Sequence, residues 1–127
     1  MLTTHLITKD MLDKDNAYIG EVDLSDFNGS LELAEGLGWV RFKRRLKVKG
    51  YIVARAGTGI SAGWGISAAF SIQCKADLRV KLRVFAGLCP WRLPKAEELK
   101  IICRRLLSGQ VAHGELVQTA AEENADG

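Results

Sequence analysis

The sequence predicts a mainly β protein whose core is a hexapeptide-type β-solenoid. From residue 46 to residue 88 every even-numbered position is uncharged and nearly all are apolar, whereas every charge lies on an odd position. Alternation with a period of two is typical of extended chain with one buried face and one solvated face. A strand normally holds this phase for about 5–6 residues, so the connections between strands must preserve it here.

A six-residue repeat runs through the alternating segment. Residues 57–62, 63–68 and 69–74 align as hexads with Ile at the fourth position and a small residue at the sixth. The register extends upstream to residue 37 and downstream to residue 86, interrupted by a two-residue insertion at Arg55-Ala56. Self-similarity at a fixed period indicates stacked units, each too small to bury its own apolar face.

The hexads resemble those of hexapeptide-repeat proteins, in which three hexads make one triangular coil of eighteen residues. With that coil length, the insertion produces one coil of twenty residues. The resemblance then implies parallel, in-register columns of like aliphatic residues: Val40 over Ile60 over Leu78, Leu46 over Ile66 over Val84, and Ile52 over Ile72.

An antiparallel β-meander or barrel is the alternative architecture. The left-handed hexapeptide family places its aliphatic residue two positions after a small residue, whereas here Trp64 and Phe70 hold that earlier position. Both rings are hard to seat inside a narrow triangular prism. Even-length turns at the glycines would also preserve the alternation, so the handedness and the meander alternative both stay open.

A closer resemblance joins the repeat to the segment that follows it. The repeat unit Gly-x-Gly-Ile-x-Ala and the segment Leu-Arg-Val-Phe-Ala-Gly-Leu-Cys-Pro-Trp-Arg at 82–92 resemble bacterial hexapeptide-repeat proteins of unknown function. The likeness covers about residues 37–117 and implies a bacterial source. It implies no activity.

One domain is expected over residues 1–127, because this length suits a single core. An acidic segment, 1–36, is expected to carry strands at 22–24 and 31–33 around a turn at 26–29. The repeat forms the core over 37–92. Both ends are expected to cover the open edges of the core.

The C-terminal part, 93–127, is expected to contain one amphipathic helix over 95–107. Pro94 suits a first helical position, Glu97 and Glu98 lie in the first turn, and Gly109 stands near the expected C-terminus. A short strand is expected near 115–119 and a disordered tail over 120–127.

Charge is concentrated in the core. Residues 37–92 carry twelve Lys or Arg and one acid, a balance of +11, whereas the flanking segments are acidic. In the column arrangement the outward residues stack as Arg41–Ser61–Arg79, Lys43–Gly63–Lys81 and Arg45–Gly65–Arg83. Two basic rows therefore flank a stripe of Gly and Ser, and we predict an anion-binding site at Arg41, Lys43, Arg45, Arg79, Lys81 and Arg83.

Three interpretations of this basic face stay open. The charges keep an otherwise adhesive sheet soluble, or they bind an anionic polymer or a membrane surface, or the flat stripe between them mediates self-association. Nucleic acid is the less favoured polymer, because few exposed aromatic residues, only Tyr51 and Phe85, lie among the charges to stack on bases.

Little in the sequence indicates catalysis. His5 and His113 lie outside the repeat, which therefore lacks the histidine base of hexapeptide acyltransferases, and no familiar catalytic motif occurs. No metal site or cofactor is expected. Three cysteines without a Cys-x-x-Cys motif favour reduced thiols in a cytoplasmic protein, and no signal or transmembrane segment is expected.

The sequence therefore favours a non-enzymatic structural or binding module that forms homo-oligomers or binds an anionic partner. The alternative is a small enzyme with a pocket between the β core and the terminal segments.

Overall fold

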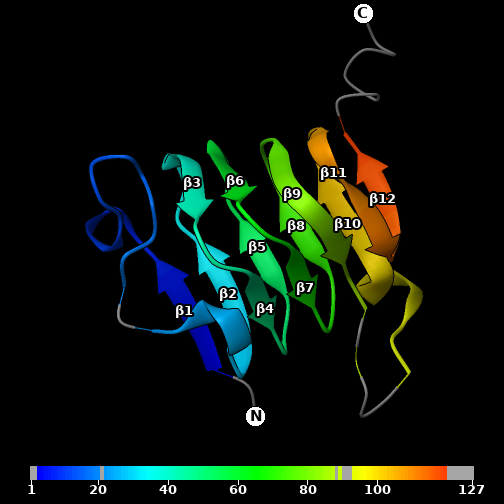
Figure 1. Ribbon diagram of the computed structural model, residues 1–127. Helices are drawn as coiled ribbons and strands as arrows, with labels where there is room; N and C mark the ends of the chain where they lie inside the picture. Colours follow the sequence, from blue (N-terminus) through cyan, green and yellow to red (C-terminus); the bar gives the residue numbers. More distant parts are fainter. Residues whose placement is uncertain (1–2, 21, 88, 90–92, 120–127) are drawn as a thin grey trace, which may run out of the picture.

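Two parallel β-sheets make up the molecule in a computed structural model that describes residues 3–20, 22–87, 89 and 93–119 (Figure 1). The first sheet has the order β1 (Thr3–Ile7), β2 (Gly29–Leu33), β5 (Ile52–Ala54), β8 (Ile72–Cys74), β10 (Lys100–Cys103), β12 (Glu115–Gln118). The second has the order β3 (Gly38–Phe42), β6 (Thr58–Ala62), β9 (Leu78–Phe85), β7 (Ile66–Ala68), β4 (Leu46–Val48), with β11 (Leu106–His113) also paired to β9. The expectation of a mainly β protein is confirmed.

The antiparallel alternative is wrong for the described part of the chain. Each ladder between named strands is parallel, and the described antiparallel pairing is an isolated bridge between Leu12 and Tyr18. Successive strands of one sheet come from successive passes of the chain, so β1 lies at one end of the stack and β12 at the other (Figure 1).

The predicted columns are confirmed residue by residue. Val40 pairs with Ile60 and Ile60 with Leu78, Leu46 pairs with Ile66 and Ile66 with Val84, and Ile52 pairs with Ile72. The spacing from Val40 to Ile60 is twenty residues and the next is eighteen, as the insertion at 55–56 requires. The third column continues on both sides, since Leu31 pairs with Ile52 and Ile101 with Ile72.

The second sheet has two arms joined by its longest strands. β3 and β6 form the first arm with the start of β9, whereas β4 and β7 form the second arm with the end of β9. β11 follows β9 along both arms. Each pass of the chain therefore turns a corner between the arms, at Gly63-Trp64-Gly65 between β6 and β7 and within β9 itself.

The interior is filled by the columns, and the alternation fails only near corners. The inward residues of the middle strands are completely buried, among them Ile60, Ile66 and Ile72. Two large apolar residues at even positions of this segment instead lie outside, Trp64 at 57% and Leu82 at 48% exposure, as does the small Ala56. The Trp64 ring, which is too large to fit easily in the narrow interior, therefore lies on the surface.

The acidic N-terminal segment covers the edges of β3 and β4. Tyr18 donates its backbone N–H to Arg41 O and Arg41 donates to Asn16 O, while Phe27 donates to Lys47 O and Lys49 donates to Phe27 O. These bonds pair backbone groups that a bare edge would leave open. These bonds place residues of the N-terminal segment along both edges.

One of the two strands expected in this segment is present. Residues 31–33 lie in β2, but the strand expected at 22–24 is wrong, because Leu24–Asp26 form a 3₁₀ turn, η2. Asp23 caps this turn by accepting a hydrogen bond from the backbone N–H of Ser25 at 2.9 Å. Local side-chain capping therefore replaces the extended conformation that the Val-Asp-Leu alternation suggested.

The helix expected over 95–107 is also wrong. The helix-starting signals produce only a 3₁₀ turn, η3 (Ala96–Leu99), in which Lys95 donates its backbone N–H to Glu98 Oε1 at 2.9 Å. The chain then becomes β10, which pairs with β8 and buries Ile101 and Cys103 completely. Pairing to the open edge of β8 prevails over the local helical pattern, because tertiary contacts override weak propensity.

The short strand expected near 115–119 is present as β12, whereas the tail expected at 120–127 lies outside the described residues. Among the helical turns of the described chain, none is long and apolar enough to cross a membrane.

Candidate anion-binding groove

The six predicted anion-binding residues divide between the two arms of the second sheet. Arg41 and Arg79 lie on the first arm, paired with Ser61 between them. The predicted row Arg41–Ser61–Arg79 is therefore confirmed as a row. Lys43 lies at the corner that follows β3, while Arg45, Lys81 and Arg83 line the outer surface of the second arm.

On the first arm, the charge of Arg79 is engaged by an aromatic ring. Its guanidinium carbon lies 4.8 Å from the ring centroid of Trp39, an attractive cation–π contact. Trp39 reaches it across Gly59, where an added Cβ would lie 3.1 Å from the indole. The absence of a side chain at Gly59 thus lets the ring cover Arg79 and leaves a flat surface.

The second arm carries a groove of about 480 Å³ over β4, β7 and the end of β9. Its floor consists of Ser67 on the middle strand, β7, and of Gly65, which directly precedes that strand. Ser67 pairs with Lys47 on one side and with Phe85 on the other. Small residues between two larger neighbours create the depression. Of the predicted stripe of Ser61, Gly63 and Gly65, the member among the described lining residues is Gly65, and Ser67 was not predicted.

The walls of this groove combine positive charge with apolar surface. Five basic residues line the groove and its continuation toward β11: Arg45, Lys47, Lys49, Lys81 and Arg83. The described lining residues include no carboxylate. The continuation is a second hollow that shares Gly65, Leu82 and Phe85 with the first and adds Gln110. A mixed cationic and apolar lining suits an anion that also has nonpolar surface.

Two large apolar residues stand at the corner beside the groove. Leu82 donates its backbone N–H to Trp64 O at 3.2 Å, so the exposed Leu82 and Trp64 are neighbours on successive passes of the chain. Alternation alone places Trp64 on the buried series, and no site was predicted there. The signal that was available is the Gly-Trp-Gly sequence, since the flanking glycines mark a corner.

A separate hollow of about 410 Å³ lies between the N-terminal segment and the corner after β3. If the protein were a small enzyme, a pocket between the β core and a terminal segment is where its active site was expected. Asp23 is the one carboxylate among its described lining residues. Hydrogen bonds from the Ser25 side chain and backbone lower the pKa of Asp23, which keeps it charged and makes it a weak general acid. The described lining brings one hydroxyl against this carboxylate, since Ser25 Oγ donates to Asp23 Oδ1 at 2.6 Å.

His5 and His113 make structural contacts rather than contribute to these hollows. Tyr18 Oη donates to Val22 O and lies 3.2 Å from His5 Nε2, and His113 Nδ1 lies 2.6 Å from Ala86 O. Burial raises the pKa of Tyr18. Each histidine ring therefore has a polar partner in a neighbouring segment, Tyr18 for His5 and Ala86 for His113.

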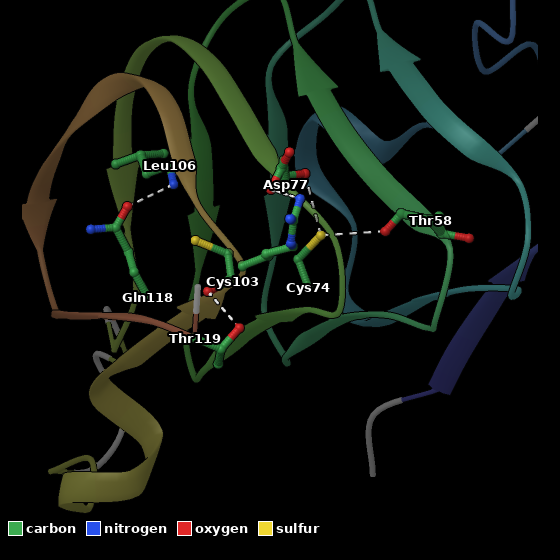
Figure 2. Close-up of polar contacts among 8 residues, drawn as sticks. Thr58, Cys74, Asp77, Cys103, Leu106, Gln118 and Thr119 are labelled. Carbon is green, nitrogen blue, oxygen red and sulfur yellow. Dashed lines mark hydrogen bonds and ion pairs between the residues drawn. The ribbon is translucent and has the colours of Figure 1, made fainter. Parts of the chain in front are cut away.

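The buried Cys74 and Cys103 lie at the ends of β8 and β10, close to the partly buried Asp77 in the turn after β8 (Figure 2). Cys74 donates its thiol to the backbone oxygens of Thr58, at 3.4 Å, and Asp77, at 3.6 Å. Burial raises the pKa of Cys103 to about 12, with further contributions from Cys74 and Asp77. Thiols that stay protonated are poor nucleophiles and poor metal ligands.

The carboxylate of Asp77 faces Arg104, with Oδ1 and Nη1 3.7 Å apart. Oδ1 is buried without a hydrogen bond from the described chain, so the charge of Arg104 compensates it. Within the described residues, no three His, Cys, Asp or Glu side chains gather in a way that could hold a metal ion.

No protein-family model, curated protein or solved structure matches this chain. The groove on the second arm is the candidate site, because it combines a hollow, a surplus of positive charge and exposed aromatic surface.

Proposed function

We propose that this chain is a short hexapeptide-type β-solenoid that works as a non-enzymatic binding module and holds an anionic polymer on its second arm. The solenoid proposal is supported by the parallel ladders and by the twenty- and eighteen-residue spacing of the columns. Each pass of the chain adds one residue to each column, which is how stacked repeats build a core.

The charge balance of the groove carries the binding proposal. Its five basic residues, with no carboxylate among the described lining, give a concentrated positive potential over a concave surface, and such surfaces attract polyanions. On the first arm, by contrast, the Trp39 ring lies over Arg79. The second arm is therefore favoured over the first.

Acidic residues of the N-terminal segment reach only one end of the basic surface. Asp23 lies near Arg44 and Arg45, and Asp13 near Lys43, close enough for these charges to contribute to the lowered pKa of each carboxyl. Lys81 and Arg83 lie at the other end, toward β11. We therefore assign the main contacts with the polymer to Lys47, Lys81 and Arg83.

Two serines in equivalent positions distinguish the arms experimentally. Ser61 lies between Arg41 and Arg79, and Ser67 between Lys47 and Phe85, and both are partly exposed on middle strands. Ser67→Asp places a negative charge on the groove floor, so it should weaken binding of heparin strongly. Ser61→Asp should leave that binding nearly unchanged.

Heparin binding is measured by calorimetry at salt concentrations from about 50 to about 200 mM, over which affinity should fall about 10- to 100-fold. A larger effect of Ser61→Asp than of Ser67→Asp would overturn the assignment to the second arm. Failure of the wild-type protein to bind heparin, DNA, RNA or acidic vesicles at about 50 mM salt would overturn the binding proposal.

We also propose self-association, at the C-terminal end of the stack. Within the described chain, β12 pairs only with β10 and β11 only with β9, so one edge of each strand is open. Open parallel edges pair readily with another chain. Leu107 on β11 is 46% exposed, and Leu107→Lys should convert a dimer to a monomer in sedimentation at micromolar concentration. A wild-type protein that sediments strictly as a monomer would refute this proposal.

A further inference from the structure

We infer that the occupant of the groove is single-stranded nucleic acid, with a base stacked on Trp64 and phosphates held by the surrounding Lys and Arg. This inference rests on the proposed function and specifies its ligand. It is carried by the position of the exposed indole, by the dimensions of the groove and by the distribution of charge around both.

The indole of Trp64 is available for stacking. Its side chain is 57% exposed, and within the described chain no aromatic ring or guanidinium lies over it, whereas Trp39 is covered by Arg79. Leu82 stands next to it on the following pass of the chain and is also exposed. An aromatic ring with an open face offers a platform to any base, independent of sequence.

The width of the groove is set by one floor strand between two wall strands. Its floor strand, β7, lies between β4 and β9, and neighbouring strands are about 4.8 Å apart, so the two wall strands are about 9.6 Å apart. Gly65 and Ser67 leave this space free of bulky side chains. A planar base fits between Lys47 and Phe85, while a duplex would present only its phosphates, because its bases stack on one another.

Positive charge surrounds the apolar surface on both sides. Lys47 lies on β4 and Lys49 directly follows it, while Lys81 and Arg83 lie on β9. Phosphates on either side of a base stacked at Trp64 therefore meet a cation in either direction. Alternating contacts of bases with aromatic rings and of phosphates with cations are the usual means of binding single strands without reading sequence.

An anionic polymer without bases would contact the basic residues of this surface but not its aromatic rings. Heparin or polyphosphate could contact the basic residues, but neither has a planar nonpolar group to place on Trp64 and Phe85. An anionic lipid surface is flat, whereas the contacts that distinguish this site lie on the floor and at the corner of a groove. Single-stranded nucleic acid supplies both kinds of group.

The test compares four probes with the complete protein by fluorescence anisotropy. They are a labelled oligothymidylate of about 12 nucleotides, its duplex with oligodeoxyadenylate, an abasic sugar-phosphate strand of the same length, and heparin. The oligothymidylate should bind most tightly. Equal affinity for the abasic strand would overturn the stacking inference, although the proposed anionic-polymer function would stand.

Trp64→Ala provides the matched structural test. It should weaken oligothymidylate binding at least about fivefold while changing the affinity for the abasic strand and heparin little. Trp64→Phe should restore most of the affinity. Ile19→Ala is the control, because Ile19 is 60% exposed but does not line the groove, and it should bind as the wild type does.

Quenching of tryptophan fluorescence provides a readout independent of affinity. Oligothymidylate should quench the wild type and Trp39→Phe, but should not quench Trp64→Phe to the same extent. Equal quenching of all three, or tighter binding to acidic vesicles than to oligothymidylate, would overturn the inference. Loss of all binding, heparin included, would overturn the proposed function with it.

Discussion

Ile66 and Val84 pair on the neighbouring parallel strands β7 and β9, and neither side chain exposes any surface to solvent. The next residue on the same strand, Ser67, points to the other face of the sheet and is partly exposed. One step along the chain therefore separates the interior from the groove floor, as the period of an extended chain requires.

We predict that Ile66→Asp prevents folding and that Ser67→Asp does not. A carboxylate at residue 66 would be buried among aliphatic side chains at a cost of several kcal/mol, comparable with the total stability of a small domain. At residue 67 the same charge faces solvent and nearby lysines. Thermal unfolding followed by circular dichroism measures both variants, and equal losses would show that the alternation does not reflect burial.

A second prediction concerns the corner that precedes β3. Thr58 is completely buried, and its hydroxyl donates to Ala34 O at 2.5 Å and accepts from the Leu37 backbone N–H at 3.1 Å. Thr58→Val should lower the free energy of unfolding by about 1–3 kcal/mol, because both backbone groups lose their partner. Thr58→Ser keeps the hydroxyl and should lose much less. Urea denaturation distinguishes them, and identical losses would contradict the role of the hydroxyl.

Thiol reactivity should divide the three cysteines. Cys74 and Cys103 are buried, and burial raises the pKa of both thiols, to about 12 for Cys103. Since the thiolate is the reactive form, neither should react with a thiol reagent at neutral pH in the folded protein. We expect one fast-reacting thiol, the partly exposed Cys89, and three after denaturation. Fast reaction of the Cys89→Ser variant would contradict this.

The same thiols make stability depend on alkaline pH. The pKa of Cys103 is raised from an ordinary value near 9 to about 12, so the folded chain keeps a proton that the unfolded chain loses. This contribution to stability is complete below pH 9 and declines as the pH rises toward 12. Cys103→Val should therefore show a shallower fall in Tm than the wild type above pH 9. Parallel curves would mean that Cys103 titrates alike in both states.

The columns could be predicted because their signal is distributed over many residues. Every second residue and every hexad of the repeat agree, and a stacking error of one residue would place charge in the interior. The predictions of a helix at 95–107 and of a strand at 22–24 depended instead on a few local residues. Their signals produced only a 3₁₀ turn, η3, at the first segment and an Asp23-capped turn, η2, at the second.

The candidate site could be predicted in part for a similar reason. The Gly/Ser stripe and its basic neighbours follow from the columns, and the structure places Arg45, Lys81 and Arg83 around one groove. The exposure of Trp64 could not be predicted from alternation, because an even position is directed inward only while the chain is extended. At a corner the backbone turns and the periodic relation between number and face is lost.

Parallel stacking also has a consequence for how this chain folds. Partners within the columns are eighteen or more residues apart, and no hairpin between named strands is present in the described chain to nucleate the sheets. Each first contact must therefore close a loop of about that length before burial compensates for the lost chain entropy. During synthesis, Ile60 and Ile66 would emerge well before Leu78 and Val84 can cover them. A nascent chain ending before β9 would thus expose the same aliphatic columns that stabilise the finished fold.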